Sequence, residues 1–181
     1  WLERGRPDDH ADDHGDGPED APARLATGPD ALAAIRRALA AGEVAAIKGL
    51  GGFHLACDAA SARAVATLRR RKRREGKPFA LMAADLQAIA RYAELDPAER
   101  ALLGSAARPV VLLRQRPDAP VAPGVAPGRD RLGFMLPYTP LHHLLLAPGE
   151  TGAGPAPTAL VMTSANLSDE PIAHTNAEAR T

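Results

Sequence analysis

The sequence predicts an α/β fold with an open sheet, because short apolar runs of strand length alternate with segments of helical periodicity. One helix is predicted from Ala62, where Val65 and Leu68 recur at three-residue spacing after Ser61, a capping residue. Ligands of open α/β sheets bind beyond the strand ends, so polar residues there are the candidate functional groups. The expected strands are 44–48, 79–82, 110–113, 132–136 and 159–163.

Cap signals predict where the other helices begin. Gly28 and Pro29 after Thr27 open a helix that ends at Gly42, with Leu32, Ile35 and Leu39 as its buried face. Two further helices are predicted from a capping side chain: a short one from Asp85 to Tyr92, and one that Asp96-Pro97-Ala98-Glu99 opens. The segment Pro137-Tyr138-Thr139-Pro140 is expected to turn into a helix that carries His142 and His143.

Composition limits the class of protein. The chain has 181 residues, 45% of them hydrophobic, which is enough for one domain with a tail. Its net charge of zero argues against a chain that binds nucleic acid over its whole surface. One cysteine, Cys57, excludes an intrachain disulfide and is typical of a reducing compartment, so we expect a cytoplasmic protein. No apolar run approaches the ~20 residues that span a membrane.

The two ends differ in character from the middle. Residues 1–24 are acidic and rich in Pro and Gly, and we expect a mobile linker; residues 25–181 form the expected folded domain. A capping box, Thr175 with Glu178, opens a helix about one turn before the last residue, and the first residue is Trp1. We therefore expect a fragment of a longer, multidomain chain.

The most unusual stretch is basic. Residues 69–74 are all Arg or Lys, and Gly76 and Pro78 are expected to end the helix there, in a surface turn before a strand. Such a cluster is either a solvated helix end or a polyanion site, for a triphosphate or for nucleic acid. Of 22 basic residues only Lys48, Lys72 and Lys77 are lysines, which favours a need for compact point charges at these positions.

Two other segments are candidate site loops. Gly49, Gly51 and Gly52 follow Lys48, and glycines at this density let backbone N–H groups approach an anion, although the loop is not a Walker motif. Ser164-Ala165-Asn166 follows the apolar strand 159–163 and is either a functional turn or an ordinary one. Cys57 lies within an apolar strand and is expected to be part of the core.

Four segments together resemble the YrdC-like domain of HypF, the carbamoyltransferase of nickel–iron hydrogenase maturation, over about residues 27–181. The resemblance implies a YrdC-like fold, an open, twisted, mixed sheet with flanking helices and a concave basic face. The segments are Lys48-Gly49-Leu50-Gly51-Gly52-Phe53-His54-Leu55-Ala56-Cys57-Asp58-Ala59, Lys72-Arg73-Arg74-Glu75-Gly76-Lys77-Pro78-Phe79, Leu136-Pro137-Tyr138-Thr139-Pro140-Leu141-His142-His143 and Thr163-Ser164-Ala165-Asn166-Leu167-Ser168.

The resemblance also implies an activity and partners. An acylphosphatase-like domain releases carbamate from carbamoyl phosphate, and this domain joins carbamate to ATP, giving carbamoyl-adenylate and pyrophosphate. A zinc-binding region and a C-terminal transfer domain complete the chain, and the transfer domain passes the carbamoyl group to HypE. ATP with Mg²⁺ is the implied cofactor set.

Site roles follow residue by residue. Lys72 and Arg74 fall on the family's Lys-x-Arg pair, implied ligands of the triphosphate, and Ser164 and Asn166 fall on its Ser-x-Asn motif, implied ligands of phosphate or Mg²⁺. On chemical grounds Lys48 is expected to hold carbamate or an α-phosphate oxygen, so that Lys48, Ser164 and Asn166 are the expected catalytic set. The expected substrate pocket is Lys48, Gly51, Gly52, His54 and His142, although either histidine could instead be structural.

Two alternatives stay open. A threonylcarbamoyl-adenylate synthase of the YrdC type, or a carbamoyl-adenylate-forming domain of an antibiotic O-carbamoyltransferase, would share the motifs. A module that binds tRNA or double-stranded RNA would use the run 69–74, but the neutral net charge and the 3% aromatic content argue against it.

Overall fold

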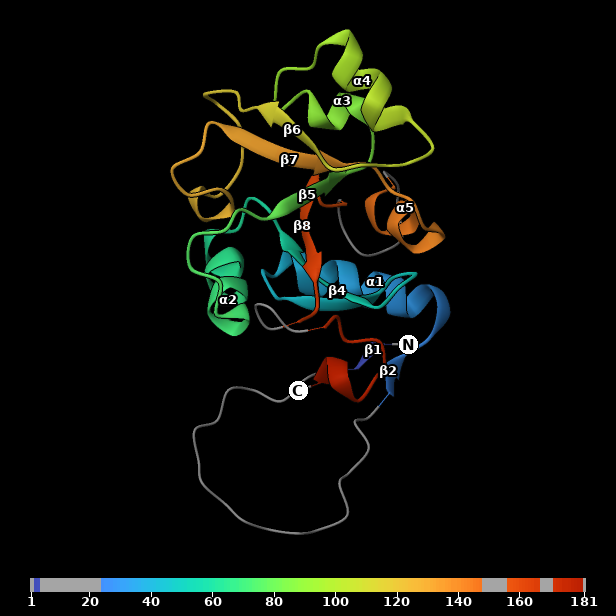
Figure 1. Cartoon of the computed structure of the whole chain (residues 1–181). Helices are drawn as coiled ribbons and strands as arrows, with labels where there is room; N and C mark the ends of the chain where they lie inside the picture. The colour runs from blue at the N-terminus through green and yellow to red at the C-terminus, as the bar shows by residue number, and fades with distance from the viewer. Residues whose placement is uncertain (1, 4–23, 148–155, 167–170, 181) are drawn as a thin grey trace.

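The computed structural model describes residues 2–3, 24–147, 156–166 and 171–180, and its centre is a six-stranded sheet with the order β3-β4-β8-β5-β7-β6 (Figure 1). β5 and β7 run parallel, and the other neighbouring strands of this sheet are antiparallel. The expected α/β open sheet is confirmed. The strands are β3 (Ala45–Lys48), β4 (Phe53–Asp58), β5 (Ala80–Ala83), β6 (Val111–Arg114), β7 (Arg131–Met135) and β8 (Ala159–Ser164).

Helices cover both faces of the sheet. They are α1 (Gly28–Ala40), α2 (Ala62–Lys72), α3 (Leu86–Ile89), α4 (Pro97–Gly104) and α5 (Pro140–Leu146). Short elements complete the described chain: β1 (Leu2–Glu3) pairs with β2 (Arg24–Ala26), and η1 (Pro123–Val125) and η2 (Glu178–Arg180) are 3-10 turns. No helix in the described part of the chain combines the length and the hydropathy that crossing a bilayer requires.

The cap signals are confirmed. The side chains of Ser61, Asp85 and Thr139 accept from the backbone N–H three residues on, and Asp96 and Glu99 form a reciprocal capping box. Thr175 and Glu178 form the same exchange of hydrogen bonds, although the segment that follows is a 3-10 turn. These contacts span three residues, so the local sequence is sufficient to specify them.

Three helix details differ from the sequence expectations. α2 ends at Lys72, where Arg73 takes a left-handed conformation with φ of 49°, and not at Gly76. α3 ends at Ile89, before Tyr92. In α1 Leu39 is buried as expected and Leu32 and Ile35 pack half-buried against the same cluster. Arg36, which was not expected there, is also buried, because its guanidinium reaches the carbonyls of Leu144 and Ala147 at the end of α5.

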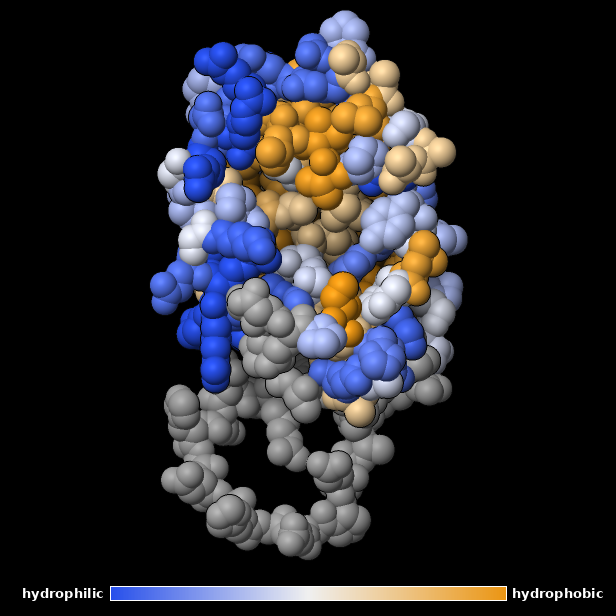
Figure 2. Space-filling view, in the orientation of Figure 1, coloured by the Kyte–Doolittle hydropathy of each residue, from blue (hydrophilic) through white to orange (hydrophobic). Residues whose placement is uncertain are grey.

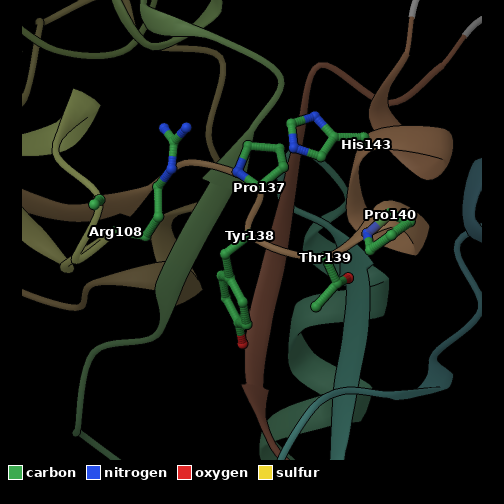
Figure 3. Close-up of a pocket in the computed structure, with 7 residues that line it drawn as sticks. Arg108, Pro137, Tyr138, Thr139, Pro140 and His143 are labelled. Atoms are coloured by element: carbon green, nitrogen blue, oxygen red, sulfur yellow. The ribbon is translucent and has the colours of Figure 1, made fainter.

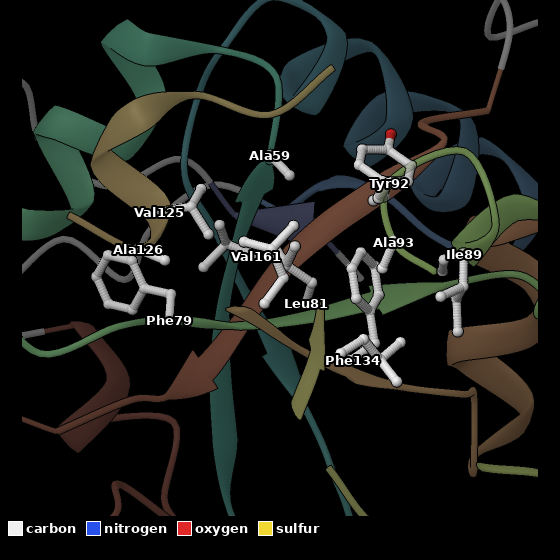
Figure 4. Packing of buried hydrophobic residues seen from close by; sticks show 14 of the residues in the cluster. Ala59, Phe79, Leu81, Ile89, Tyr92, Ala93, Val125, Ala126, Phe134 and Val161 are labelled. Atoms are coloured by element: carbon white, nitrogen blue, oxygen red, sulfur yellow. The ribbon is translucent and has the colours of Figure 1, made fainter. Parts of the chain in front are cut away.

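Two hydrophobic clusters hold the layers together. Leu81, Phe134 and Val161, from three neighbouring strands, pack on one face beneath α2, α3, α4 and η1 (Figure 4). On the other face α1 and α5 cover a smaller cluster that includes Ile47 and Met162. Cys57 lies in the first cluster with no exposed surface, and burial raises its pKa to about 12, so the expectation of a core cysteine is confirmed.

The acidic segment 1–24 falls almost entirely on residues 4–23, which lie outside the described residues. The expectation of a linker there stays a prediction, as does the boundary at residue 25.

Candidate active site

One end of the sheet collects most of the predicted site residues. The register pairs His54 with Ser164 and Lys48 with Phe53, so the end of β8 lies beside the start of β4 and the end of β3. A hydrogen bond from Ala165 N to Phe53 O, 2.8 Å long, continues this pairing past β8. Because β4 is antiparallel to both β3 and β8, this end of the sheet combines the ends of β3 and β8 with the start of β4.

Lys72 connects the basic segment to this end of the sheet. It is the last residue of α2, and 2% of its surface is exposed. Its Nζ donates to Ser164 O at 2.5 Å, to Asn166 O at 2.7 Å and to Asn166 Oδ1 at 2.9 Å. A lysine ammonium has three N–H donors, and these three acceptors match them. The expectation that Lys72 lies in a surface turn is wrong, since it lies beneath the turn that carries Ser164 and Asn166.

The surroundings of Lys72 disfavour its charge. Burial, with a smaller contribution from the positive charge of Arg74, lowers the pKa of Lys72 from 10.5 to about 8. The ammonium is therefore the dominant form at neutral pH, but its proton is held less firmly than that of an exposed lysine. The three oxygen acceptors are what make a charged lysine tolerable at this depth.

Arg74 is also ordered by its neighbours. Its guanidinium stacks 5.0 Å from the centroid of the Phe79 ring and donates to the carbonyls of Lys77 and Pro78. Arg69 stacks on the same ring at 4.6 Å and donates to Gly124 O and Arg74 O. The segment after α2 is thus a packed turn around Phe79, and half-buried Arg74 lies at its surface.

The glycine-rich segment is a tight hairpin between β3 and β4. Gly49 N donates to Gly52 O at 2.7 Å, and a Cβ on Gly49 would lie 3.1 Å from the His54 ring. A Cβ on Gly52, where φ is 152°, would lie 2.5 Å from Ile172 Cγ2 and 2.8 Å from Ala173 O. The glycines at 49 and 52 thus allow close packing, and the expectation that the backbone of this loop binds an anion stays a prediction. A Cβ on Gly51 would meet no described atom within 4 Å.

Lys48 and His54 lie on opposite faces of the sheet. Directly paired residues of antiparallel strands share a face, so Lys48 lies with Phe53, and His54 lies with Ile47 and Ser164. Lys48 is exposed, with Nζ 5.5 Å from the centroid of the Phe53 ring. The structure therefore does not bring Lys48 into one pocket with His54.

Two histidines and a tyrosine stack on the α5 side of the sheet. The His54 and His142 rings lie 5.9 Å apart at 21°, and Tyr138 meets His142 edge-on at 4.6 Å. His142 has no exposed surface, and among the described residues neither of its ring nitrogens has a hydrogen-bond partner. Burial, then the neighbouring His54 and His143, lower the pKa of His142 to about 4, and burial also lowers the pKa of His54. Both imidazoles are therefore neutral at pH 7.

The surface around this end is hollowed. Figure 2 shows a central hollow that strongly hydrophilic residues border on the side of α2. A separate open pocket of about 370 Å³ lies on the α5 side, and in Figure 3 the Tyr138 ring points away from Arg108 and His143. Its lining is Ala106, Arg108, Pro137, Tyr138, Thr139, Pro140 and His143. Tyr138 is shared by this pocket and the histidine pair.

The chain matches a family of known proteins over most of its length. The family model of Sua5, YciO and YrdC, described as "Telomere recombination", matches residues 37–181. The chain belongs to this family. The expected YrdC-like fold is thereby confirmed.

Within the family, the chain is similar to HypF carbamoyltransferases. The chain is 52% identical over 159 residues to carbamoyltransferase HypF2 of Cupriavidus necator, and the alignment covers 83% of this chain and 20% of the relative. It is 52% identical over 151 residues to carbamoyltransferase HypF of Rhodobacter capsulatus, covering 83% and 19%. A crystal structure of full-length HypF in the phosphate- and nucleotide-bound form superposes with a TM-score of 0.74 at 47% identity, over 82% of this chain and 22% of that one. The chain spans about a fifth of the length of these relatives.

Two residues that line the pocket on the α5 side are not among the predicted site residues. Tyr138 was quoted only as part of a motif, yet its ring contacts both histidines. Arg108 has a left-handed φ of 45°, a backbone feature with no sequence signal in an arginine. An aromatic residue between two prolines, directly before a helix with two histidines, is the signal that could have identified Tyr138.

Proposed function

We propose that this chain catalyses the ATP-dependent formation of carbamoyl-adenylate and pyrophosphate from carbamate, as one step of HypF-type carbamoyl transfer. The observation that carries the proposal is the contact of Lys72 with Ser164 and Asn166. This contact brings the Lys-x-Arg and Ser-x-Asn segments together, although 92 to 94 residues separate the bonded residues in the sequence. The glycine-rich segment lies next to them, because His54 is paired with Ser164 in the sheet.

The reaction needs positioning more than it needs a nucleophilic side chain. An oxygen of carbamate forms a bond to the α-phosphorus, the bond from that phosphorus to the bridging oxygen breaks, and pyrophosphate leaves with the electron pair. The protein must hold two anions together and neutralise charge on the leaving group. In our proposal Ser164 and Asn166 contact the α-phosphate, Arg74 faces the β- and γ-phosphates, and Mg²⁺ enters bound to ATP.

The acceptor side is assigned to the face of the sheet where His54 lies beside Ser164. His54 is half-buried there, and His142 stacks against it as a neutral ring. A neutral imidazole can accept from the carbamate NH₂ group as well as donate, which a protonated one cannot. Of the expected substrate set, Gly51 contributes backbone alone, and exposed Lys48 would reach substrate only from the other face of the sheet.

The proposal extends to partners. Carbamate would come from carbamoyl phosphate through an acylphosphatase-like domain, and a zinc-binding region, a transfer domain and HypE would complete the path of the carbamoyl group. The high identity of this chain to segments of HypF carbamoyltransferases supports these assignments. In this scheme the chain performs one half-reaction of a longer enzyme.

The decisive test is exchange of labelled pyrophosphate into ATP. We expect exchange when carbamoyl phosphate is supplied with a separate acylphosphatase domain, and none when either is left out. Asn166→Ala should lose most of the exchange. Ser105→Ala, beyond α4 at the far end of the molecule in Figure 1, should keep it. Exchange that needs threonine and bicarbonate instead would assign the chain to threonylcarbamoyl-adenylate synthesis.

Nucleic-acid binding has one observation in its favour. Arg70, Arg71 and Arg73 are exposed at the end of α2. A filter-binding assay with tRNA or double-stranded RNA would support it by a steep fall of affinity with salt, because each neutralised phosphate releases counterions. We expect weak binding with little discrimination between the two RNAs.

A further inference from the structure

The open pocket on the α5 side of the sheet has an arginine in its wall. The pocket has a volume of about 370 Å³, and Arg108, Pro137, Tyr138, Pro140 and His143 are among the residues that line it. Pockets of this size are typical of sites for small molecules. None of the residues that the proposed reaction assigns to ATP or carbamate lines the pocket, so we treat it as a separate feature and call it the Arg108 pocket.

Arg108 differs from the other arginines that the fold removes from solvent. Arg36, Arg69 and Arg74 are buried or half-buried, and each donates to backbone carbonyls of the protein. Arg108 is half-buried as well, yet its guanidinium forms no hydrogen bond, ion pair or ring contact in the part of the chain that the structure describes. A guanidinium carries five N–H donors in a fixed fork that matches a carboxylate or a phosphate. These donors are therefore available to a ligand.

The backbone of Arg108 is also unusual. Its φ of 45° lies in the left-handed region, which residues with a Cβ rarely occupy, and the following Pro109 restricts the backbone further. The Arg108 N–H donates to Ser105 O at 3.1 Å and closes the turn after α4. Such conformations persist where the surrounding structure enforces them, and they cluster at functional sites. Here the turn brings the arginine to the wall of the pocket.

The rest of the wall suits an anion with an apolar body. In Figure 3 the guanidinium of Arg108 and the ring of His143 lie on either side of Pro137. The imidazole of His143 can donate an N–H to the same ligand. Pro137, Pro140 and the half-buried ring of Tyr138 supply apolar surface.

One carboxylate lies in the neighbourhood. Asp85 lines an adjoining pocket of about 230 Å³ that shares Pro137 and His143 with the first. Its side chain accepts from Ala88 N at 2.7 Å as a helix cap. Among the described residues it forms no ion pair with Arg108 or His143, so the arginine has no counterion from this part of the protein.

We propose that the Arg108 pocket binds a small ligand that carries a carboxylate or phosphoryl group, at a site distinct from that for ATP. Arg108 holds the anionic group through its guanidinium fork, and His143 donates from the other side of Pro137. The body of the ligand lies on the two prolines and on the Tyr138 ring. The proposal does not depend on whether the chain forms carbamoyl-adenylate.

The chain offers a direct probe of this pocket, because it contains only two tyrosines. Tyr138 lines the pocket, whereas Tyr92 is buried in the core and its hydroxyl bonds Thr158. In fluorine NMR of the chain labelled with 3-fluorotyrosine, Tyr138 is the reporter and Tyr92 is the internal reference. The titrants are acetate, benzoate, inorganic phosphate and phenyl phosphate, at constant ionic strength with chloride as the balancing anion.

We expect the Tyr138 signal alone to shift saturably. Two charge-assisted hydrogen bonds support a dissociation constant on the order of 1 mM. The ring-bearing anions should bind at least about threefold more tightly than acetate and phosphate, because their rings cover apolar surface. The class that binds more tightly, carboxylate or phosphate, identifies the anionic group of the ligand. Equal binding with and without a ring would contradict the apolar part of the proposal.

Three variants make the test specific. Arg108→Gly removes the guanidinium and suits a left-handed backbone, so anion affinity should fall at least about tenfold while the midpoint of thermal unfolding does not fall. Arg108→Gln, which keeps a Cβ and a polar side chain, should lose the same affinity. Arg100→Gln, which removes an exposed charge from α4, should stay within about threefold of the wild type. Unchanged anion affinity in both Arg108 variants would overturn the proposal.

Competition with ATP tests whether the site is distinct. With ATP in excess, the anion should still shift the Tyr138 signal, with an affinity within about threefold of that without ATP. Displacement by ATP would merge the pocket with the nucleotide site and overturn the proposal. The absence of a saturable Tyr138 shift with all four anions would also overturn it, whereas the pyrophosphate exchange assay tests the proposed reaction alone.

Discussion

Lys72 Nζ lies 2.9 Å from Asn166 Oδ1, although 94 residues separate the two in the sequence. The basic segment 69–74 therefore reaches the candidate site from inside the protein, through the buried ammonium of Lys72. The two members of one short motif have different environments. Lys72 is 2% exposed, whereas Arg74 is half-buried against Phe79 at the surface.

Replacement of Lys72 should cost stability. Lys72→Ala removes a buried side chain and leaves the carbonyls of Ser164 and Asn166 without this donor, so we expect the free energy of unfolding to fall by about 2–4 kcal/mol. Lys77→Ala, exposed in the same segment, should change it by less than about 0.5 kcal/mol. Urea denaturation of both variants measures the difference. Equal midpoints would contradict the buried role of Lys72.

His142 should make the fold sensitive to acid. Its pKa is about 4 in the folded protein and 6.5 as the reference value, so below pH 6.5 the unfolded chain binds a proton that the folded chain does not. The contribution of His142 to the free energy of unfolding is therefore complete above pH 6.5. It is lost as the pH falls towards 4, by on the order of 3 kcal/mol, since each pKa unit is worth about 1.4 kcal/mol.

The test of this acid sensitivity is the free energy of unfolding between pH 7 and 4. His142→Phe keeps a ring in the stack and removes the titrating group, so its stability should fall less steeply with acid than that of the wild type. His143→Gln, at the adjacent exposed position, removes only the last and smallest of the three causes that lower the pKa of His142, so its slope should stay close to that of the wild type. An unchanged slope in His142→Phe would exclude this histidine as the cause.

Gly52 and Gly51 allow a matched pair of alanine substitutions, one into a crowded position and one into open space. Gly52→Ala would place Cβ 2.8 Å from Ala173 O, so segment 171–173 must shift and its hydrogen bonds with Phe53 and Ala165 must weaken. We expect a loss of about 1–3 kcal/mol. Gly51→Ala should be within about 0.5 kcal/mol of the wild type, because no described atom lies within 4 Å of the new Cβ.

Thermal unfolding compares the two glycine variants, and hydrogen exchange locates the damage. The amides of Phe53 and Ala173, which bond Ala173 O at 2.7 Å and Ala165 O at 2.8 Å, should lose protection in Gly52→Ala alone. If Gly51→Ala proved equally harmful, the packing account of this hairpin would be wrong.

Asn166→Ala should affect the reaction rate more than ATP binding. Contacts to the α-phosphate tighten as charge moves to pyrophosphate, and contacts that are stronger in the transition state raise the rate. We expect single-turnover pyrophosphate release to slow by about 100-fold or more, with ATP affinity within about fivefold of the wild type. A variant that reacts at the wild-type rate, or one that merely fails to bind ATP, would show that the turn has another role.

The sequence alone determined those features whose causes lie within a few residues. The caps at Ser61, Asp96 and Thr139 are contacts to residues three positions on, and their helices begin where they were expected. The apolar run 159–163 is long enough for one strand and lacks charge, so its burial as β8 followed directly. The resemblance of four motifs to a known family predicted the family and supplied the set of candidate residues.

Tertiary structure decided what those candidates do. The burial of Lys72 depends on β8, which pairs with β4 although more than a hundred residues separate the two strands in the sequence. No local pattern distinguishes this lysine from the exposed basic residues around it. Gly52 is required because Ile172 and Ala173 pack onto it from the far end of the chain. The separation of Lys48 from His54 follows from the strand register, in which a shift of one residue would exchange the two faces. Each of these features depends on which distant segment packs against a residue, and that packing is determined only when the whole core forms.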